Sequence, residues 1–195
     1  DNISSDFIFG LPGQSLADWE EDLRRALSLD VQHLSAYSLT YESGTPLFRQ
    51  RERGEVQECD EEVSLAMFET LIAQTAEAGF EQYEISNFAR AGCRAQHNAS
   101  YWSGRPYIGL GPAAHSFDGH ATRSYNLPDL RAYIDAAEGQ RPFPTEVETL
   151  TPDEQLNEVV MTRLRTKEGI DLEAFARRFG PAKCNLLLRS AQPYL

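Results

Sequence analysis

The chain has 195 residues, of which 41% are hydrophobic and 25% charged, a composition typical of a soluble globular protein. Its net charge of −12 argues against a nucleic-acid-binding surface, which needs clustered lysine and arginine, and disfavours attachment to anionic lipid. No apolar run approaches the roughly 18 to 20 residues of a membrane span and no signal peptide opens the chain, so we expect a cytoplasmic protein that does not span a membrane.

The cysteines are too few and too far apart for a disulfide framework, and their spacing excludes a CxxC-type metal site. They stand at Cys59, Cys93 and Cys184. A reducing cytoplasm fits this usage. The chain begins in a buried-looking run and ends soon after an apolar one, so we interpret it as a fragment of something longer.

The first ninety residues alternate between strand and helix patterns. A short aromatic run, "DFIFGL", is ended by Pro12-Gly13, as expected of a buried strand. Ser15 then opens a helix with a capping-box pattern, because Asp18 stands three residues later. Strands are predicted at 6–11, 33–40 and 81–86, and the helices between them begin at Ser15 and near Asp60. This order predicts parallel βαβ units.

The second half is less regular. Residues 87–127 leave the regular alternation, and we interpret them as a long functional segment with one or two short strands. Residues 128–138 predict a helix. "GQRPFPTE" is the best candidate for a linker. Helix starts at Thr151-Pro152 and at Asp171 then predict a small helical unit. The predicted domains are 1–120, a connecting helix and linker at 121–145, and 146–195.

Several residues suggest chemistry, each with a structural alternative. "GLGPAA" (109–114) matches a dinucleotide-binding pattern, but no clean βαβ unit follows, so tight turning near a ligand is favoured. Asp6, on a buried strand, would contact a ribose hydroxyl or act as a structural cap. Glu84 would be a general base or a buried partner for an arginine. The scattered histidines His33, His115 and His120 are better explained as ordinary hydrogen-bonded residues.

The stretch "HNASYW" (97–102) concentrates one imidazole, one amide and two large aromatic rings. His97 could ligate iron, with Asn98 orienting it and Tyr101 and Trp102 stacking on a planar macrocycle. Alternatively, the four residues form a polar corner pinned by hydrogen bonds from the tyrosine and the tryptophan. The residues alone favour this structural alternative.

Five motifs, in order, resemble successive signatures of the HemW family, the radical S-adenosylmethionine (SAM) proteins related to oxygen-independent coproporphyrinogen III oxidase. They are "DFIFGLPGQS", "HLSAYSLTYESGTPLF", "QYEISNFA", "HNASYW" and "YIGLGPAAHSF". "GIDLEAFARRFG" is similar to that family's C-terminal domain. The resemblance implies an α/β fold: the second half of a partial radical SAM (β/α) barrel, followed by a small helical, winged-helix-like region.

The resemblance also implies cofactors, namely SAM, a [4Fe–4S] cluster and haem. The family's CxxxCxxC cluster motif would lie upstream, and no three cysteines here have that spacing. The implied SAM-binding residues are Asp6 at the ribose, with Tyr37 and Leu39 at the adenine. The implied haem-binding residues are His97, Asn98, Tyr101 and Trp102, with His97 as the iron ligand. Gly109, Gly111 and Pro112 resemble the turn at the barrel's closing edge.

Two functions follow from the resemblance. One is a haem chaperone that binds haem and passes it to an acceptor protein, such as a respiratory one, with SAM and the cluster controlling transfer. The other is the oxidase, which decarboxylates coproporphyrinogen III to protoporphyrinogen IX in porphyrin biosynthesis. The signature at residues 97–102 favours the chaperone, and we expect the fragment alone to be inactive.

Overall fold

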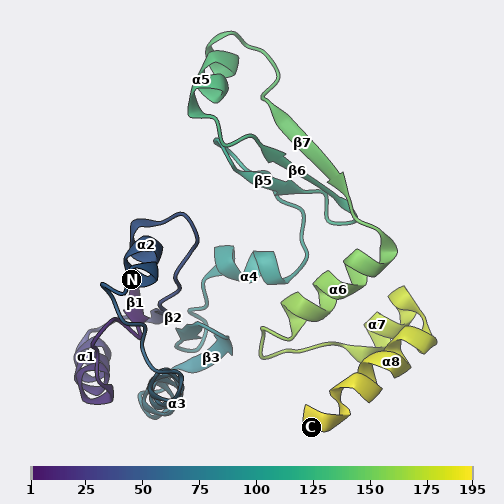
Figure 1. The fold of residues 1–195 in the computed structure, drawn as a ribbon. Coiled ribbons are helices and arrows are strands. Elements are labelled where there is room, and N and C mark those ends of the chain that lie inside the picture. The colour runs from purple at the N-terminus through teal and green to yellow at the C-terminus, as the bar shows by residue number, and fades with distance from the viewer. Residues whose placement is uncertain (1, 195) are drawn as a thin grey trace. The chain divides into compact units, whose positions relative to one another are not determined.

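The structure is a computed structural model that describes residues 2–194 and divides into two compact units, 2–95 and 96–194 (Figure 1). The first unit is a four-stranded sheet covered by helices. The second combines a three-stranded antiparallel sheet with a group of short helices. Each unit is described by itself below.

The sheet of the first unit has the order β1-β2-β4-β3. β1 (Ser4–Phe9) and β2 (His33–Ser38) are parallel and are joined by α1 (Leu16–Ser28), which confirms the predicted βαβ unit. The capping box predicted at Ser15 and Asp18 is present. α2 (Pro46–Glu52) and α3 (Glu61–Glu77) then lead to the remaining strands.

The third predicted strand differs from expectation. Residues 81–86 form β3 (Glu81–Glu84) and then a turn into β4 (Asn87–Ala89), which lies between β3 and β2 and is antiparallel to both. Because two antiparallel pairings separate them, β3 still runs in the same direction as β2. The turn contains no glycine or proline, so no sequence signal marked it.

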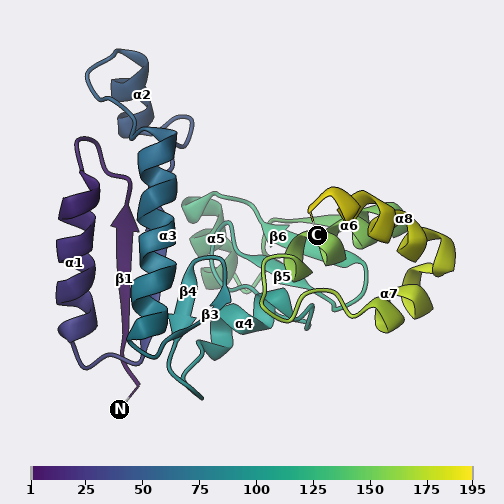
Figure 2. The same cartoon turned by 90° about the horizontal axis from the view of Figure 1, so that it is seen from below.

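The core of the first unit lies between the sheet and the two long helices. Figure 2 shows β1 between α1 and α3. The indole of Trp19 is buried there, its Nε1 donates to the Met67 carbonyl at 3.0 Å, and its ring lies 5.3 Å from that of Phe9. The largest fully buried side chains of this core are Trp19, Phe88, Leu23, Leu34, Met67 and Leu71.

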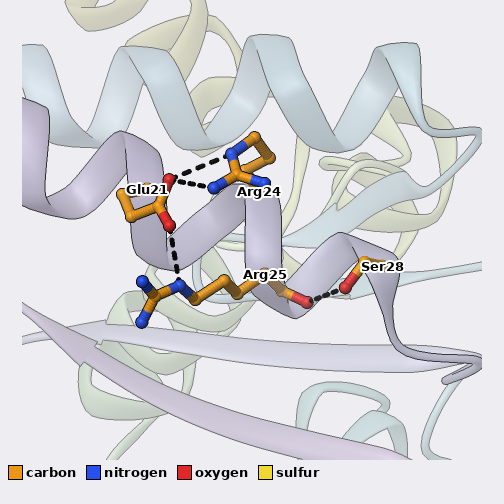
Figure 3. A network of polar contacts seen from close by, with 4 residues as sticks. All are labelled: Glu21, Arg24, Arg25 and Ser28. Carbon is orange, nitrogen blue, oxygen red and sulfur yellow. Dashed lines mark hydrogen bonds and ion pairs between the residues drawn. The ribbon is translucent and has the colours of Figure 1, made fainter.

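The outer surface of α1 carries ion pairs between neighbouring side chains. Glu21 accepts hydrogen bonds from Arg24 and Arg25, and Ser28 bonds the Arg25 carbonyl one turn later (Figure 3). The bonds from Arg24, and then from Arg25, lower the pKa of Glu21. The group is solvent-exposed, so its ion pairs add little to stability.

The second unit begins with α4 (Gln96–Trp102) and continues into an antiparallel sheet of order β5-β6-β7. The strands are β5 (His115–Phe117), β6 (Thr122–Asn126) and β7 (Thr145–Thr149), and α5 (Leu130–Glu138) lies between the last two in sequence. The helices that follow are α6 (Pro152–Arg163), α7 (Leu172–Phe179), α8 (Pro181–Ala191) and the short η1 (Gln192–Tyr194).

Helix starts in this unit follow the sequence closely. The capping box at Thr151, the proline at the first turn of α6 and the Asp171 cap of α7 are all present. Of the segment 139–146, only Thr145 and Glu146 belong to β7, which pairs with β6 along its whole length. The two compact units divide near residue 95, and the domain boundaries predicted near 120 and 145 stay predictions.

Candidate functional site

The face of the sheet that the helices leave open carries the predicted SAM contact Asp6. In register, Asp6 lies beside Ser35, and Ile8 beside Tyr37. The Asp6 carboxylate is exposed and accepts no hydrogen bond within the described residues, and Ile8 and Tyr37 are 51% and 42% exposed. A carboxylate with unused acceptors beside apolar and aromatic surface suits a ligand that presents hydroxyl groups.

A row of hydrogen-bonded polar groups crosses the sheet from Ser4, two residues before Asp6 on the same strand. The His33 ring bonds Ser4 Oγ through Nδ1 and Tyr83 Oη through Nε2, both at 2.8 Å, and Tyr83 Oη accepts from the Ala95 amide. Burial lowers the pKa of His33, and the charge of Asp6 opposes this shift more weakly. Burial also raises the pKa of Tyr83. His33 is thus a satisfied structural histidine, as its isolation in sequence suggested.

Glu84 directly follows Tyr83 and is the last residue of β3. Its Oε2 accepts from the Ser86 amide at 3.0 Å and from Asn87 Nδ2 at 2.6 Å, and both Glu84 and Asn87 are buried. Asn87 faces Ser35 across the β2–β4 pair. These bonds hold the β3–β4 turn, a role that the sequence did not suggest.

The two residues implied at the adenine occupy different surroundings. Leu39 lines a cavity of about 670 Å³ at the carboxyl ends of β1 and β2, whereas Tyr37 lies on the open face beside Ile8. Tyr41 also lines this cavity, and its Oη is buried without a hydrogen-bond partner in the described chain. Burial chiefly raises the pKa of Tyr41. Ligands of open α/β sheets bind at this edge.

The "HNASYW" stretch forms the helix α4, which the sequence analysis did not predict. Positions four apart share a helical face, so His97 pairs with Tyr101. The imidazole meets the phenol ring edge-on at 5.1 Å, and Tyr101 meets Tyr107 at 5.0 Å. His97 is exposed, and its ring nitrogens make no hydrogen bond within residues 2–194. A free imidazole beside aromatic surface fits an axial haem ligand.

Trp102 lies on a different face of α4. Its indole is stacked under the Arg165 guanidinium at 4.8 Å, and its Nε1 is buried without a hydrogen-bond partner in the described residues. Asn98 is half-buried, four residues earlier in the helix. The structure therefore brings His97 and Tyr101 together and turns Trp102 towards the C-terminal helices.

The glycine-rich segment after α4 exposes apolar side chains. Ile108 and Leu110 are 84% and 85% exposed. Gly109 is required, because a Cβ there would lie 2.1 Å from the His115 carbonyl oxygen. Gly111 has a φ of 107° and donates its amide to Tyr133 Oη. No helix begins within this segment, in agreement with the rejection of a dinucleotide-binding loop.

Within residues 2–194 there is no group of three or more His, Cys, Asp or Glu side chains placed to hold a metal ion. The three cysteines are separate and unbridged. The residues present therefore do not fit a [4Fe–4S] cluster, whose irons need several thiolates at one place. The described helices include none that is both long and apolar enough to cross a membrane.

Comparison with known proteins supports the resemblance. Residues 150–192 match the HemN C-terminal domain. The chain is 38% identical over 181 residues to "Heme chaperone HemW" of Bacillus subtilis, covering 92% of this chain and 47% of that protein. It is 38% identical over 175 residues to "Radical S-adenosyl methionine domain-containing protein 1, mitochondrial" of Danio rerio, covering 86% of this chain and 39% of that one.

Among solved structures, coproporphyrinogen III oxidase (HemN) from Escherichia coli, described as a radical SAM enzyme, superposes with a TM-score of 0.73. The sequences are 18% identical, and the match covers 98% of this chain and 47% of that one. The fold is thus that of part of a radical SAM protein with a helical C-terminal region.

The chain belongs to the HemW-like family of radical SAM proteins. It spans about half the length of the curated relatives it matches.

Proposed function

We propose that this chain is part of a radical SAM haem chaperone and carries the haem contact on α4. The observation that carries the proposal is the free imidazole of His97 on an exposed helical face, flanked by Tyr101. An imidazole nitrogen that no other group occupies is available to iron. Relatives named as haem chaperones share most of this chain.

The surroundings of His97 support the same ligand. Tyr101 and Tyr107 extend the aromatic surface from α4, and Ile108 follows with an exposed apolar side chain. A monomeric protein leaves such side chains exposed together when something covers them in use. A flat macrocycle would cover them, with His97 binding its iron and the tyrosines lying against its edge or face.

Asp6 would hold SAM by accepting hydrogen bonds from the ribose hydroxyls, and Leu39 would lie at the adenine end. Bound SAM together with a cluster supplies radical or redox chemistry; the residues described here only bind and orient. The cluster ligands would have to come from a segment other than residues 2–194. The bound haem would then pass to an acceptor protein.

The alternative function is oxygen-independent coproporphyrinogen III oxidation, which the fold shared with the Escherichia coli enzyme favours. Two measurements on the intact, cluster-loaded protein separate the functions. A haem chaperone binds haem stoichiometrically and releases no CO₂ from coproporphyrinogen III. Turnover of coproporphyrinogen with no stoichiometric haem binding would replace the first proposal with the second.

A further inference from the structure

The row of hydrogen-bonded polar groups that starts at Ser4 ends on the residue before α4. His33 and Tyr83 are each 2% exposed, and the bond between His33 Nε2 and Tyr83 Oη is 2.8 Å long. The same phenol oxygen accepts the amide of Ala95 at 3.3 Å. Ala95 is the last residue of the first unit, and α4 begins at the next residue. Tyr83 therefore holds the backbone from which α4 starts.

The start of α4 has no strong helix signal of its own. Alanine is a poor N-cap, because it has no side-chain oxygen to accept an amide of the first turn. A helix of seven residues is marginal by itself, and none of the residues of α4 is buried. Its C-terminal end is held by the Arg165 guanidinium, which lies over the Trp102 ring at 4.8 Å. His97 is the second residue of the helix, so the bond between Ala95 and Tyr83 lies close to it in the chain.

The directions of these hydrogen bonds follow from the groups that make them. An amide N–H only donates, so the phenol oxygen accepts from Ala95 and the phenol proton is available to His33. The neutral ring then accepts this proton at Nε2 and donates from Nδ1 to Ser4 Oγ at 2.8 Å. In this arrangement each donor between the ring and Ala95 has an acceptor, as expected of a buried polar network.

A proton added to the His33 ring conflicts with this arrangement. Nε2 then carries hydrogen and has to donate to the phenol oxygen, so the Tyr83 proton loses its acceptor and the oxygen has to accept twice. The bond from Ala95 is the longer of the two, 3.3 Å against 2.8 Å, and it is the one that yields. Protonation of His33 therefore releases Ala95.

Burial and the neighbouring charges set the pH at which this happens. Burial lowers the pKa of His33, and the charge of Asp6 on β1 opposes the shift more weakly. On β4 the residue opposite His33 is the uncharged Ala89. Beside β3 the Arg94 guanidinium lies 5.1 Å from the centroid of the Tyr83 ring, and its charge disfavours another cation. His33 is therefore neutral at pH 7.5 and gains a proton only below about pH 6.5.

We propose that Tyr83 is a positioning residue for the haem contact on α4, and that it holds the start of this helix only while His33 is neutral. The inference rests on the proposed function, because the haem contact is His97. Acidification frees the start of α4 and weakens haem binding beyond the effect of protonating His97 itself. The network is thus a proton-dependent control on the haem site.

The first test is hydrogen exchange of the Ala95 amide, followed by NMR on the isotope-labelled full chain and corrected for the intrinsic rate at each pH. In the wild type the protection factor should be roughly 3- to 10-fold higher at pH 7.5 than at pH 5.5. Tyr83→Phe keeps the ring but removes the acceptor, so the protection factor should be low at both pH values. His33→Gln should remove the pH dependence.

The second test is the haem affinity of the intact protein at pH 7.5. Tyr83→Phe should bind haem roughly 3- to 10-fold more weakly with an unchanged Soret maximum, because His97 still ligates the iron. Tyr125→Phe is the matched control. It removes a phenol hydroxyl that bonds Glu146 in the other sheet, so it should keep the wild-type affinity and the wild-type exchange of Ala95.

Wild-type protection of Ala95 in Tyr83→Phe, or an unchanged pH dependence in His33→Gln, would overturn the proton-dependent hold on α4. Wild-type haem affinity in Tyr83→Phe, together with lost protection of Ala95, would overturn the positioning role of Tyr83. A wild-type protein that binds no haem would remove the proposed function, while the exchange measurement would still decide whether Tyr83 holds Ala95.

Discussion

At the scale of single residues, unused hydrogen-bonding capacity separates structural side chains from candidate ligand contacts. Both nitrogens of His33 are occupied by protein groups. Asp6 and His97 are polar, exposed and unbonded within the described residues. Sequence patterns placed Asp6 and His33 on strands but did not predict the helix that holds His97. Which histidine was satisfied depended on Tyr83, fifty positions away from His33.

Asp6→Asn should weaken SAM binding in the intact, cluster-loaded protein. Replacing the carboxylate removes a charged acceptor, and hydrogen bonds to charged groups contribute about 1.5–3 kcal/mol. Calorimetric titration with SAM measures the loss. Asp22→Asn on α1 is the control and should bind normally. Unchanged affinity in Asp6→Asn would assign Asp6 a structural role.

His33 should make stability depend on pH. Its pKa is lowered by burial, so the folded chain holds the neutral ring while the unfolded chain binds a proton below about pH 6.5. Stability therefore rises with pH and is lost as pH falls below about 6.5. In His33→Gln, urea unfolding at pH 5.5 and at pH 8 should differ less than in the wild type. The exposed His120→Gln should keep the wild-type slope, and an equal slope in His33→Gln would refute the assignment.

At the scale of elements, the sequence predicted long, capped and amphipathic segments and missed short ones. The helices that begin after Ser15, Asp60, Thr151 and Asp171 all have side-chain caps, which are local signals. β4, with three residues, and α4, with seven, have no cap or period long enough to detect. The β3–β4 turn depends instead on the buried bond between Glu84 and Asn87.

Trp19 anchors α1 to α3, so its truncation tests the layer that supports β1. Trp19→Ala should cost about 3–5 kcal/mol of unfolding free energy, because a buried indole leaves a large cavity. Denaturant unfolding of the chain measures this. Glu20→Ala, exposed on the same helix, should change stability by less than about 0.5 kcal/mol. A small loss in Trp19→Ala would show that α1 contributes little to the core.

At the scale of the whole molecule, composition limited the possible functions more than it identified one. The net charge of −12 and the scattered cysteines excluded classes of ligand, but haem and SAM entered only through resemblance to a family. The reason is physical: the candidate haem contacts come from α4 and from the segment between α4 and β5, and the candidate SAM contact comes from a pair of parallel strands. Spacing in sequence does not show which strands pair, nor which side chains from separate segments lie together.

The 195-residue chain should not assemble a [4Fe–4S] cluster when reconstituted anaerobically with iron and sulfide. Its thiols are separate, and two of them are only half-buried on different segments. Iron and sulfide analysis after desalting should find far less than four of each per chain. Stoichiometric cluster with the characteristic visible absorption would contradict this expectation.

The most direct test of the central proposal is a haem titration of the intact protein followed in the Soret region. His97→Ala should lower haem occupancy and shift the Soret band while far-ultraviolet circular dichroism stays unchanged, because alanine offers iron no axial nitrogen. His120→Ala, which removes another exposed histidine of the same unit, should retain the wild-type spectrum and affinity. Wild-type occupancy and Soret position in His97→Ala would contradict the haem site on α4.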